Sequence, residues 1–288
     1  MFHIILNPVS GNKKASKNFR KVEKTLQQRG VAYELHETHA AREAEAIARE
    51  LTLKGETEII VFGGDGTLHE VLNGLVDPAV CTIGLVPSGT GNDFVAALGL
   101  PLKPEEAILR ILDGAAKPID YLQVGERRCM NIGGVGMDVD VLVHCAENNT
   151  KGKLKYIMQL LKSIYTYKGC PITVYRDGEE DKTYNAFLAA ACNGQQFGGG
   201  VRICPAANVD DGKIHVVIVD VIEKKWTLTK TLVKLLRGKI LDHPRCTHYL
   251  CEKVRFVPNE PCTYQLDGEL YQSEDIEIQV CQGLRMYR

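Results

Sequence analysis

The sequence predicts the α/β plus β class: an N-terminal three-layer α/β domain with a parallel sheet, then a C-terminal antiparallel β-sandwich domain. Two observations predict this division. Apolar strands alternate with amphipathic helices over roughly the first 120 residues. Short β-rich runs separated by Gly, Asn and Asp make up most of the remaining chain.

Four strands are predicted in the first half, at residues 2–6, 31–35, 58–62 and 81–86. Three helices are predicted between them from apolar side chains that recur every three or four residues. The residues that mark them are Phe19, Val22 and Leu26, then Ile47 and Leu51, then Leu68, Val71, Leu72 and Leu75. Because strand and helix alternate, the sheet is expected to be parallel and covered on both faces.

Six β-rich runs predict the second domain, at residues 129–132, 172–175, 186–192, 214–221, 254–257 and 276–280. Most are joined by Gly, Asn and Asp turns, which is typical of an antiparallel sandwich with one or two helices. The domains are expected at residues 1–122 and 123–282. A return of residues 283–288 to the first domain is left open.

Composition is that of a globular protein and excludes several functional classes. Hydrophobic residues form 44% of the 288-residue chain, and the formal net charge is −1, so nucleic-acid binding is not expected. The first apolar run is short for a signal peptide, and no uncharged stretch has the length of a membrane span. The ten cysteines form no close C-x-x-C pair, and no His/Cys group has zinc-ligand spacing. A cytoplasmic protein with reduced thiols is expected.

Three glycine-containing loops follow predicted strands: NPVSG at 7–11, GGDGT at 63–67 and PSGTGND at 87–93. Because the carboxyl ends of parallel strands meet at one edge of a sheet, the loops should lie together. Glycines let backbone N–H groups approach phosphate oxygens, and a helix that begins after Thr67 directs its positive end there. The loops predict a phosphate cradle, although each alone also fits a tight turn. GGVGMD at 133–138 lacks the third glycine of a dinucleotide fingerprint and is interpreted as a turn.

Asp65 and Asp93 lie inside these loops, where a carboxylate would repel a phosphate. A bound Mg²⁺ would remove the conflict, because it bridges phosphate oxygens and one or two carboxylates. The alternative is that each aspartate caps a helix N-terminus. His69 is predicted to lie on a helix surface, without a catalytic role.

The motifs GGDGTLHEVLNG at 63–74 and PSGTGNDF at 87–94 resemble the catalytic domain of the diacylglycerol kinase family. The remaining motifs of the resemblance follow in the expected order: NPVSG at 7–11, NIGGVGMDVDV at 131–141, CPAANVDDGKI at 204–214 and QLDGE at 265–269. The resemblance implies a bacterial soluble lipid kinase that transfers the γ-phosphoryl group of ATP to a lipid hydroxyl, with diacylglycerol as the expected acceptor.

The resemblance also implies an active site in the cleft between the two domains, and it implies the residues of that site. Glu269 would be the catalytic base, beside Asp267, with Asp65 and Asp93 on catalytic Mg²⁺. From the residues alone, Asp267-Gly268 would be interpreted as a hairpin turn. The implied ATP site comprises Asn7, Ser10, Gly11, Thr38, Gly63, Gly64, Asp65, Gly66, Thr67, Glu70, Asn73, Ser88, Gly89, Thr90 and Asn92.

A second, structural Mg²⁺ is implied by the resemblance of ANVDDGK to a loop of the bacterial members. Asp211 would supply the carboxylate, and Asn208 and Lys213 would contribute backbone carbonyls. A plain Asp-Asp-Gly turn is the alternative. Asp120 resembles the acidic partner of the family's interdomain network, and it could equally be a strand-end cap.

Two basic segments, residues 151–168 and 223–241, each carry a net charge of +5 and an apolar stripe at helical spacing. In the second segment the stripe is Leu228, Leu232, Leu235 and Leu236. Basic amphipathic helices suit an anionic membrane surface, so peripheral contact with the inner face of the membrane is expected. Two ordinary helices that cover the sandwich are the alternative.

Two rival functions remain at this point: a kinase for NAD or a sugar phosphate, which shares GGDGT, and a nucleotide-binding regulator without catalysis. The residues do not identify the lipid acceptor, and a homodimer is left open.

Overall fold

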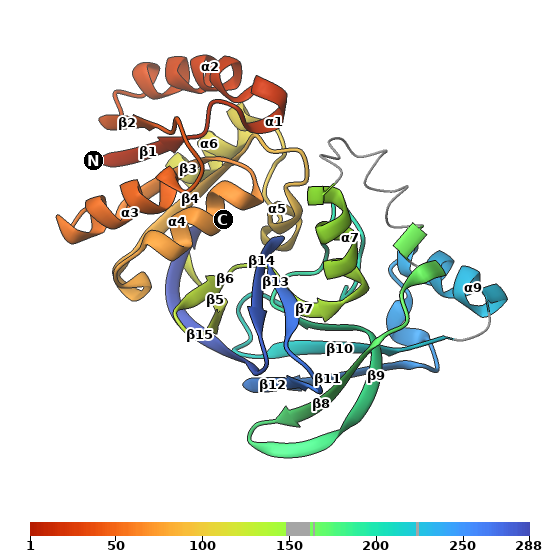
Figure 1. Cartoon of the computed structure of the whole chain (residues 1–288). Coiled ribbons are helices and arrows are strands. Elements are labelled where there is room, and N and C mark those ends of the chain that lie inside the picture. Colours follow the sequence, from red (N-terminus) through yellow and green to blue (C-terminus); the bar gives the residue numbers. More distant parts are fainter. Residues whose placement is uncertain (148–161, 164, 223–224) are drawn as a thin grey trace. The chain divides into compact units, whose positions relative to one another are not determined.

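The computed structural model describes the chain except for residues 148–161, 164 and 223–224 (Figure 1). The described residues form two compact units. Unit 1 comprises Met1–Tyr121, Val209–Asp211 and Cys281–Arg288, and unit 2 comprises Leu122–Asn208 and Gly212–Val280. The predicted fold class is confirmed, because unit 1 is a parallel α/β domain and unit 2 is an antiparallel β-sandwich.

Strands β1 to β4 of unit 1 form a parallel sheet. Its order is β2 (Tyr33–Glu37), β1 (Phe2–Leu6), β3 (Glu58–Gly63) and β4 (Thr82–Pro87). The end of β15 (Ile276–Tyr287) adds a further parallel pairing, in which Arg285 and Met286 lie opposite Thr82 and Ile83 of β4. The central strands are nearly continuous apolar runs, as expected for a sheet that is buried on both faces.

Helices cover both faces of this sheet (Figure 1). On one face α2 (Ala15–Gln28) and α6 (Pro104–Asp113) form a core cluster with the strands, including Phe19 and Ile108. On the other face lie α3 (Glu43–Leu53) and α4 (Asp65–Gly74), which pack against each other. Three short elements complete the unit: α1 (Ser10–Lys13), the 3-10 turn η1 (Pro78–Val80) and α5 (Asp93–Leu98).

Unit 2 is built from antiparallel strands in the order β14, β13, β7, β9, β8, β12 and β15, with β10 beside β9 and β11 beside β10. Its strands are β6 (Arg127–Cys129), β7 (Ile132–Gly136), β8 (Cys170–Arg176), β9 (Glu179–Cys192), β10 (Ile214–Asp220), β11 (Cys246–Cys251), β12 (Lys253–Pro258), β13 (Cys262–Leu266) and β14 (Glu269–Ser273), with parts of β5 (Ala116–Val124) and β15. Its described helical elements include α7 (Met137–Glu147), α9 (Lys225–Leu236) and η2 (Ile240–Asp242).

The two faces of the sandwich strands bury different apolar clusters. Along β10, Val216 and Ile218 belong to one cluster, whereas Val217 and Val219 belong to the other. Leu228 and Leu235 of α9 join the second cluster. The apolar stripe predicted for residues 223–241 therefore does not lie on one face. Leu228 and Leu235 face the core, whereas Leu236 is 60% exposed. Most of the other basic segment, residues 151–168, lies outside the described residues.

Two local expectations are wrong. The predicted strand at 129–132 is broken between β6 and β7, because the N–H groups of Met130, Asn131 and Ile132 donate to the side chain of Asp267. The predicted turn at 133–138 is instead the buried strand β7 and the start of α7. Its glycines permit close strand packing, since a Cβ on Gly134 would overlap the Ala189 carbonyl oxygen.

Candidate phosphate-binding and catalytic site

The three glycine loops of unit 1 are in direct backbone contact. A Cβ built on Gly64 would lie 2.8 Å from the Cα of Gly89, and a Cβ on Gly11 would overlap the carbonyl oxygen of Ser88. Gly11 also has φ +60°, a conformation that favours glycine. The glycines at these positions therefore allow the loops after β1, β3 and β4 to meet.

Hydrogen bonds link the same three loops. Asn7 Nδ2 donates to Thr67 Oγ1 at 3.1 Å, which connects the first loop to the second. The backbone N–H of Ser88 donates to the Gly63 carbonyl at 2.7 Å, which connects the second to the third. Within the third loop, Asn92 Oδ1 accepts the N–H of Gly89 at 3.0 Å. The loops form one hydrogen-bonded assembly at the carboxyl edge of the sheet.

Asp65 connects the second loop to helix α5. Its two carboxylate oxygens accept the backbone N–H groups of Asp93 and Phe94, each at 3.1 Å. Asp65 therefore caps the first turn of α5, although it belongs to α4. Asp93 is itself buried. The carboxylates of both residues lie near the Cβ position that Gly91 lacks, so they face the same small space.

The other predicted nucleotide residues lie in or beside this loop assembly. Thr38 is buried directly after β2, and its N–H donates to the Leu6 carbonyl at 2.9 Å. Gly66 and Thr90 are exposed at the tips of their loops, and a Cβ on Gly66 would enter open space. Ser10 begins the short helix α1 beside Gly11.

The side chains of Glu70 and Asn73 make hydrogen bonds that stabilise helix α4 and its packing. Glu70 Oε2 accepts the N–H of Ala44 at 3.2 Å, which fixes α3 against α4. Asn73 Nδ2 donates to the His69 carbonyl at 2.9 Å and lies 3.3 Å from His69 Nε2. The expectation that His69 lies on the helix surface is wrong, because it is buried with only 4% of its surface exposed.

In unit 2, Asp267 and Gly268 form the two-residue turn between β13 and β14. Both have positive φ, +53° and +93°, and Leu266 pairs with Glu269 across the turn. This is the geometry of a tight hairpin turn that favours Asp-Gly. Glu269 is the first residue of β14, and it is exposed.

The Asp267 carboxylate anchors this turn to the preceding part of unit 2. Oδ1 accepts the N–H groups of Asn131 and Ile132 at 2.8 and 3.2 Å, and Oδ2 accepts that of Met130 at 2.7 Å. The Cys129 thiol also donates to Oδ1 at 3.0 Å. A cluster of N–H donors stabilises the charged carboxylate. Asp267 therefore positions the turn that carries Glu269.

Two buried residues that sequence reasoning did not select complete the anchor. Gln265 Oε1 accepts the N–H of Gly268 at 2.9 Å, and its Nε2 donates to Asp138 Oδ2 at 3.1 Å. Burial raises the pKa of Asp138 to about 6, and hydrogen bonds from Gln265 and from the backbone oppose that rise. The motif GGVGMD ends in Asp138, but no signal along the chain connected it to the turn at Asp267.

The structural Mg²⁺ and network predictions concern the end of the loop between β9 and β10, and Asp120 of β5. Asp120 is buried, and its N–H donates to the Val209 carbonyl at 2.6 Å. Asp211 is exposed, as is Asn208, and Lys213 Nζ pairs with Glu252 Oε1 at 2.6 Å. Asp211 belongs to unit 1, whereas Asn208 and Lys213 belong to unit 2. Binding of Mg²⁺ by these three residues stays a prediction.

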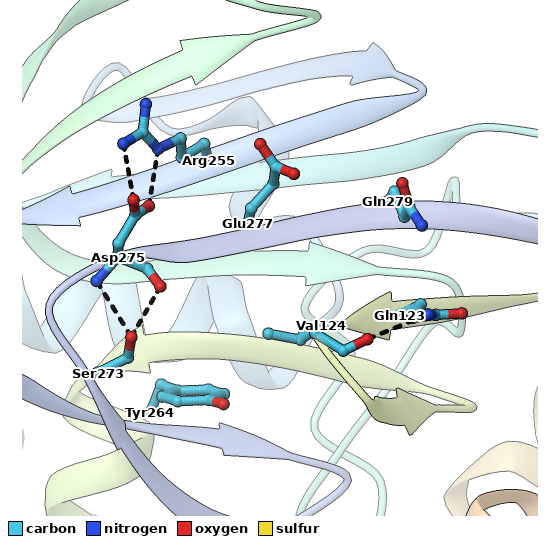
Figure 2. Close-up of a pocket in the computed structure, with 9 residues that line it drawn as sticks. Gln123, Val124, Arg255, Tyr264, Ser273, Asp275, Glu277 and Gln279 are labelled. Atoms are coloured by element: carbon cyan, nitrogen blue, oxygen red, sulfur yellow. Dashed lines mark hydrogen bonds and ion pairs between the residues drawn. The ribbon is translucent and has the colours of Figure 1, made fainter.

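A cavity of about 650 Å³ on unit 2 has a polar lining (Figure 2). Arg255 and Asp275 form a two-pronged ion pair across it, at 2.7 and 2.6 Å, and Ser273 Oγ donates to the Asp275 carbonyl at 2.7 Å. The charges are already paired within the protein. This cavity lacks the apolar lining that acyl chains would require.

A parallel α/β unit with contiguous glycine loops, and a sandwich that presents an anchored carboxylate, are the features of a nucleotide-dependent kinase with two units. Comparison with known families agrees with this class. The diacylglycerol kinase catalytic domain matches residues 1–124, and the YegS C-terminal NAD kinase beta sandwich-like domain matches residues 132–284. The chain belongs to the YegS-like lipid kinase and diacylglycerol kinase family.

Individual relatives cover nearly the whole chain. A protein of Xanthomonas euvesicatoria pv. vesicatoria named "Probable lipid kinase YegS-like" is 32% identical, over 99% of this chain and 95% of its own length. A "Diacylglycerol kinase" of Bacillus subtilis is 30% identical, over 92% and 88%. A solved structure of a candidate diacylglycerol kinase from Bacillus anthracis str. Sterne is 26% identical, covers 99% of this chain and 96% of its own, and has a TM-score of 0.80.

Membership of this kinase family implies the use of ATP. Within the described part of the chain, no helix combines the length and the apolar character needed to cross a membrane.

Proposed function

We propose that this protein transfers the γ-phosphoryl group of ATP to the hydroxyl of a neutral lipid, with diacylglycerol as the acceptor and phosphatidic acid as the product. The observation that carries the proposal is the backbone contact among the three glycine loops, because their clustered N–H groups would bind phosphate oxygens. Family membership and the names of the relatives support a lipid as the acceptor.

The loop assembly of unit 1 would hold the triphosphate. Gly66 and Thr90 are exposed at its rim, and helix α4 begins at Asp65, so its N-terminal end carries partial positive charge. Mg²⁺ would be held by Asp65 and Asp93, which face the same small space. The ion would neutralise the charge of the phosphate oxygens.

Glu269 is the proposed general base. Its carboxylate accepts the proton of the lipid hydroxyl as that oxygen attacks the γ-phosphorus, and ADP departs with the bridging oxygen. The reaction requires Glu269 of unit 2 to reach the hydroxyl that attacks the nucleotide held by unit 1. The anchor at Asp267 supports this role because it fixes the start of β14 while leaving the Glu269 side chain exposed.

A lipid acceptor requires contact with a membrane surface, and we propose a peripheral location at the cytoplasmic face. Helix α9 and the residues after it offer exposed Val233 and Leu236 together with exposed Lys230, Arg237 and Lys239. Basic side chains beside exposed apolar ones suit an anionic bilayer surface.

The direct test is phosphate transfer from γ-labelled ATP in mixed micelles against a panel of lipids. The panel includes diacylglycerol, monoacylglycerol, ceramide, a sphingoid base and phosphatidylglycerol, with NAD as a soluble acceptor. We expect label in an organic-extractable product and the highest kcat/KM with diacylglycerol. Label found only in a phosphorylated NAD, or ATP binding without transfer to any acceptor, would reject the lipid kinase proposal.

A further inference from the structure

Unit 2 contains a second group of reactive side chains, and none of them belongs to the kinase site. Cys204, His215 and His248 each offer one ligand atom, and these three atoms lie within 4.8 Å of one another. Cys192 lies beside them, because its thiol hydrogen-bonds to the sulfur of Cys204. We call Cys192, Cys204, His215 and His248 the Cys/His cluster.

Three adjacent strands and one loop supply the Cys/His cluster. On β9 and β10, Cys192 and His215 are directly opposite each other. On β11, His248 is opposite Val217, so it is a diagonal neighbour of His215 on the same face of the sheet. Because the ligands come from separate strands and a loop, spacing along the chain carries no zinc signal, and the cluster forms only in three dimensions.

Cys204 reaches this face from the loop between β9 and β10. Its backbone N–H donates to the Gln195 carbonyl at 3.1 Å, and its carbonyl accepts the N–H of Ala207 at 3.0 Å. The neighbouring Ile203 is buried in the same core cluster. Both backbone hydrogen-bonding groups of Cys204 are therefore fixed within the loop, and this fixes the position of its sulfur beside the two histidines.

Two separations among the ligand atoms are close to those of a tetrahedral metal site. Cys204 Sγ lies 3.9 Å from His248 Nε2, and His215 Nδ1 lies 3.2 Å from the same nitrogen. Tetrahedral zinc, with Zn–S near 2.3 Å and Zn–N near 2.0 Å, places sulfur and nitrogen about 3.6 Å apart and two nitrogens about 3.3 Å apart. The two imidazole rings stack, with their centroids 5.4 Å apart and an angle of 21° between their planes.

Hydrogen bonding alone accounts poorly for this arrangement. His248 Nε2 contacts both a sulfur and a ring nitrogen, although one ring nitrogen carries either a single proton or a single lone pair. The cluster is also deeply placed, because Cys192 and Cys204 are fully buried and His215 is 4% exposed.

We propose that the Cys/His cluster binds zinc, with Cys204, His215 and His248 as three ligands and Cys192 as the fourth. Two sulfur and two nitrogen ligands in tetrahedral geometry are the set that zinc takes in structural sites. Four protein ligands leave no open position, so the ion has a structural role. It ties the loop that carries Cys204 to β9, β10 and β11, and its binding energy adds to the stability of unit 2.

The first test is the metal content of the purified full-length protein, isolated without chelators or added metal and measured by mass spectrometry of the elements. We expect a stoichiometric amount of zinc in the wild type and about tenfold less or lower in Cys204→Ser and His248→Gln. The matched control is Cys251→Ser, because Cys251 is a buried thiol on β11 that belongs to the core cluster of the opposite face. This control is expected to keep its zinc.

A second test uses only wild-type protein, so it does not depend on the folding of variants. Replacement of zinc by cobalt should produce thiolate-to-cobalt charge-transfer absorption, and removal of metal by a strong chelator should lower the Tm by about 5 °C or more. Readdition of zinc should restore the Tm.

Three results would overturn the proposal. They are a wild type that neither contains zinc nor takes it up at micromolar concentration, zinc retained at full stoichiometry in both Cys204→Ser and His248→Gln, and a Cys192–Cys204 disulfide in the protein as isolated. None of these results bears on the kinase proposal, which is tested by phosphate transfer.

Discussion

Asp65 in unit 1 and Asp267 in unit 2 occupy comparable acidic glycine turns, yet their carboxylates are used differently. Asp65 accepts two backbone N–H groups, one on each oxygen, and both come from the start of helix α5. Asp267 accepts three backbone N–H groups and one thiol. The more heavily bonded carboxylate has less capacity left for a ligand. In unit 2 we propose that the carboxylate that takes part in the chemistry is the next one along the chain, the exposed Glu269.

The largest expected effect comes from Glu269→Gln, which keeps the shape of the side chain but removes its capacity to accept a proton. We expect the rate of lipid phosphorylation to fall about 10³-fold with little change in stability, because the side chain is exposed. Initial rates with diacylglycerol measure the effect. Glu274→Gln, at another exposed glutamate of unit 2, is the matched control and should retain normal rates. Turnover of Glu269→Gln within about threefold of the wild type would remove the proposed base.

An effect of intermediate size is expected on stability, where substitution of Asp267 should cost more than substitution of Asp65. Asparagine offers one oxygen in place of two, so Asp267→Asn leaves more buried donors without a charged partner than Asp65→Asn does. We expect losses in the free energy of unfolding of about 3 kcal/mol for Asp267→Asn and about 1 to 2 kcal/mol for Asp65→Asn. Urea unfolding followed by circular dichroism measures both. Equal losses, or a larger loss for Asp65→Asn, would contradict the distinction drawn from the hydrogen bonds.

Asp138 extends the comparison to a third carboxylate. Burial raises the pKa of Asp138 by more than its hydrogen bonds lower it. Its folded pKa of about 6 exceeds the ordinary 3.8, so the folded state binds more protons than the unfolded state between these values. Its contribution to stability is therefore lost as pH rises from about 4 to about 6, and the penalty is constant above that range. Asp138→Asn should stabilise the protein by about 1 to 2 kcal/mol at pH 7.5, but not at pH 4. Urea midpoints of both proteins at the two pH values test this, and a gain of equal size at pH 4 would contradict it.

The sequence predicted the sheet and the meeting of the three glycine loops because both depend on short-range signals. The apolar run at 58–62 corresponds to β3, and the run at 81–86 corresponds to β4 with a shift of one residue. In contrast, the strand expected at 31–35 is Tyr33–Glu37, since this strand is only half-buried and lacks a continuous apolar run. Local periodicity is informative where both faces are buried and much weaker where one face meets solvent.

Long-range polar contacts could not be predicted in the same way. The residue pair Asp267 and Asn131 is separated by 136 positions, and nothing near either residue indicates the other. The break between β6 and β7 follows from that contact, so the local pattern at 129–132 was misleading. The expected roles of Asp65 and Asp93 on Mg²⁺ are untested. For Asp65 the structure shows the alternative interpretation, the capping of a helix N-terminus, and the capped helix is α5.

The parallel pairing of β15 with β4 has a consequence for how the protein is made. Leu284 and Met286 are fully buried in unit 1, although more than 150 residues of unit 2 separate them from most of that unit. During synthesis the backbone groups at this edge of β4 therefore have no partner from β15 until residues 281–288 have been translated. An N-terminal fragment cut at the end of β5 would keep that unprotected edge permanently, and we expect it to aggregate unless the last eight residues are supplied as a peptide.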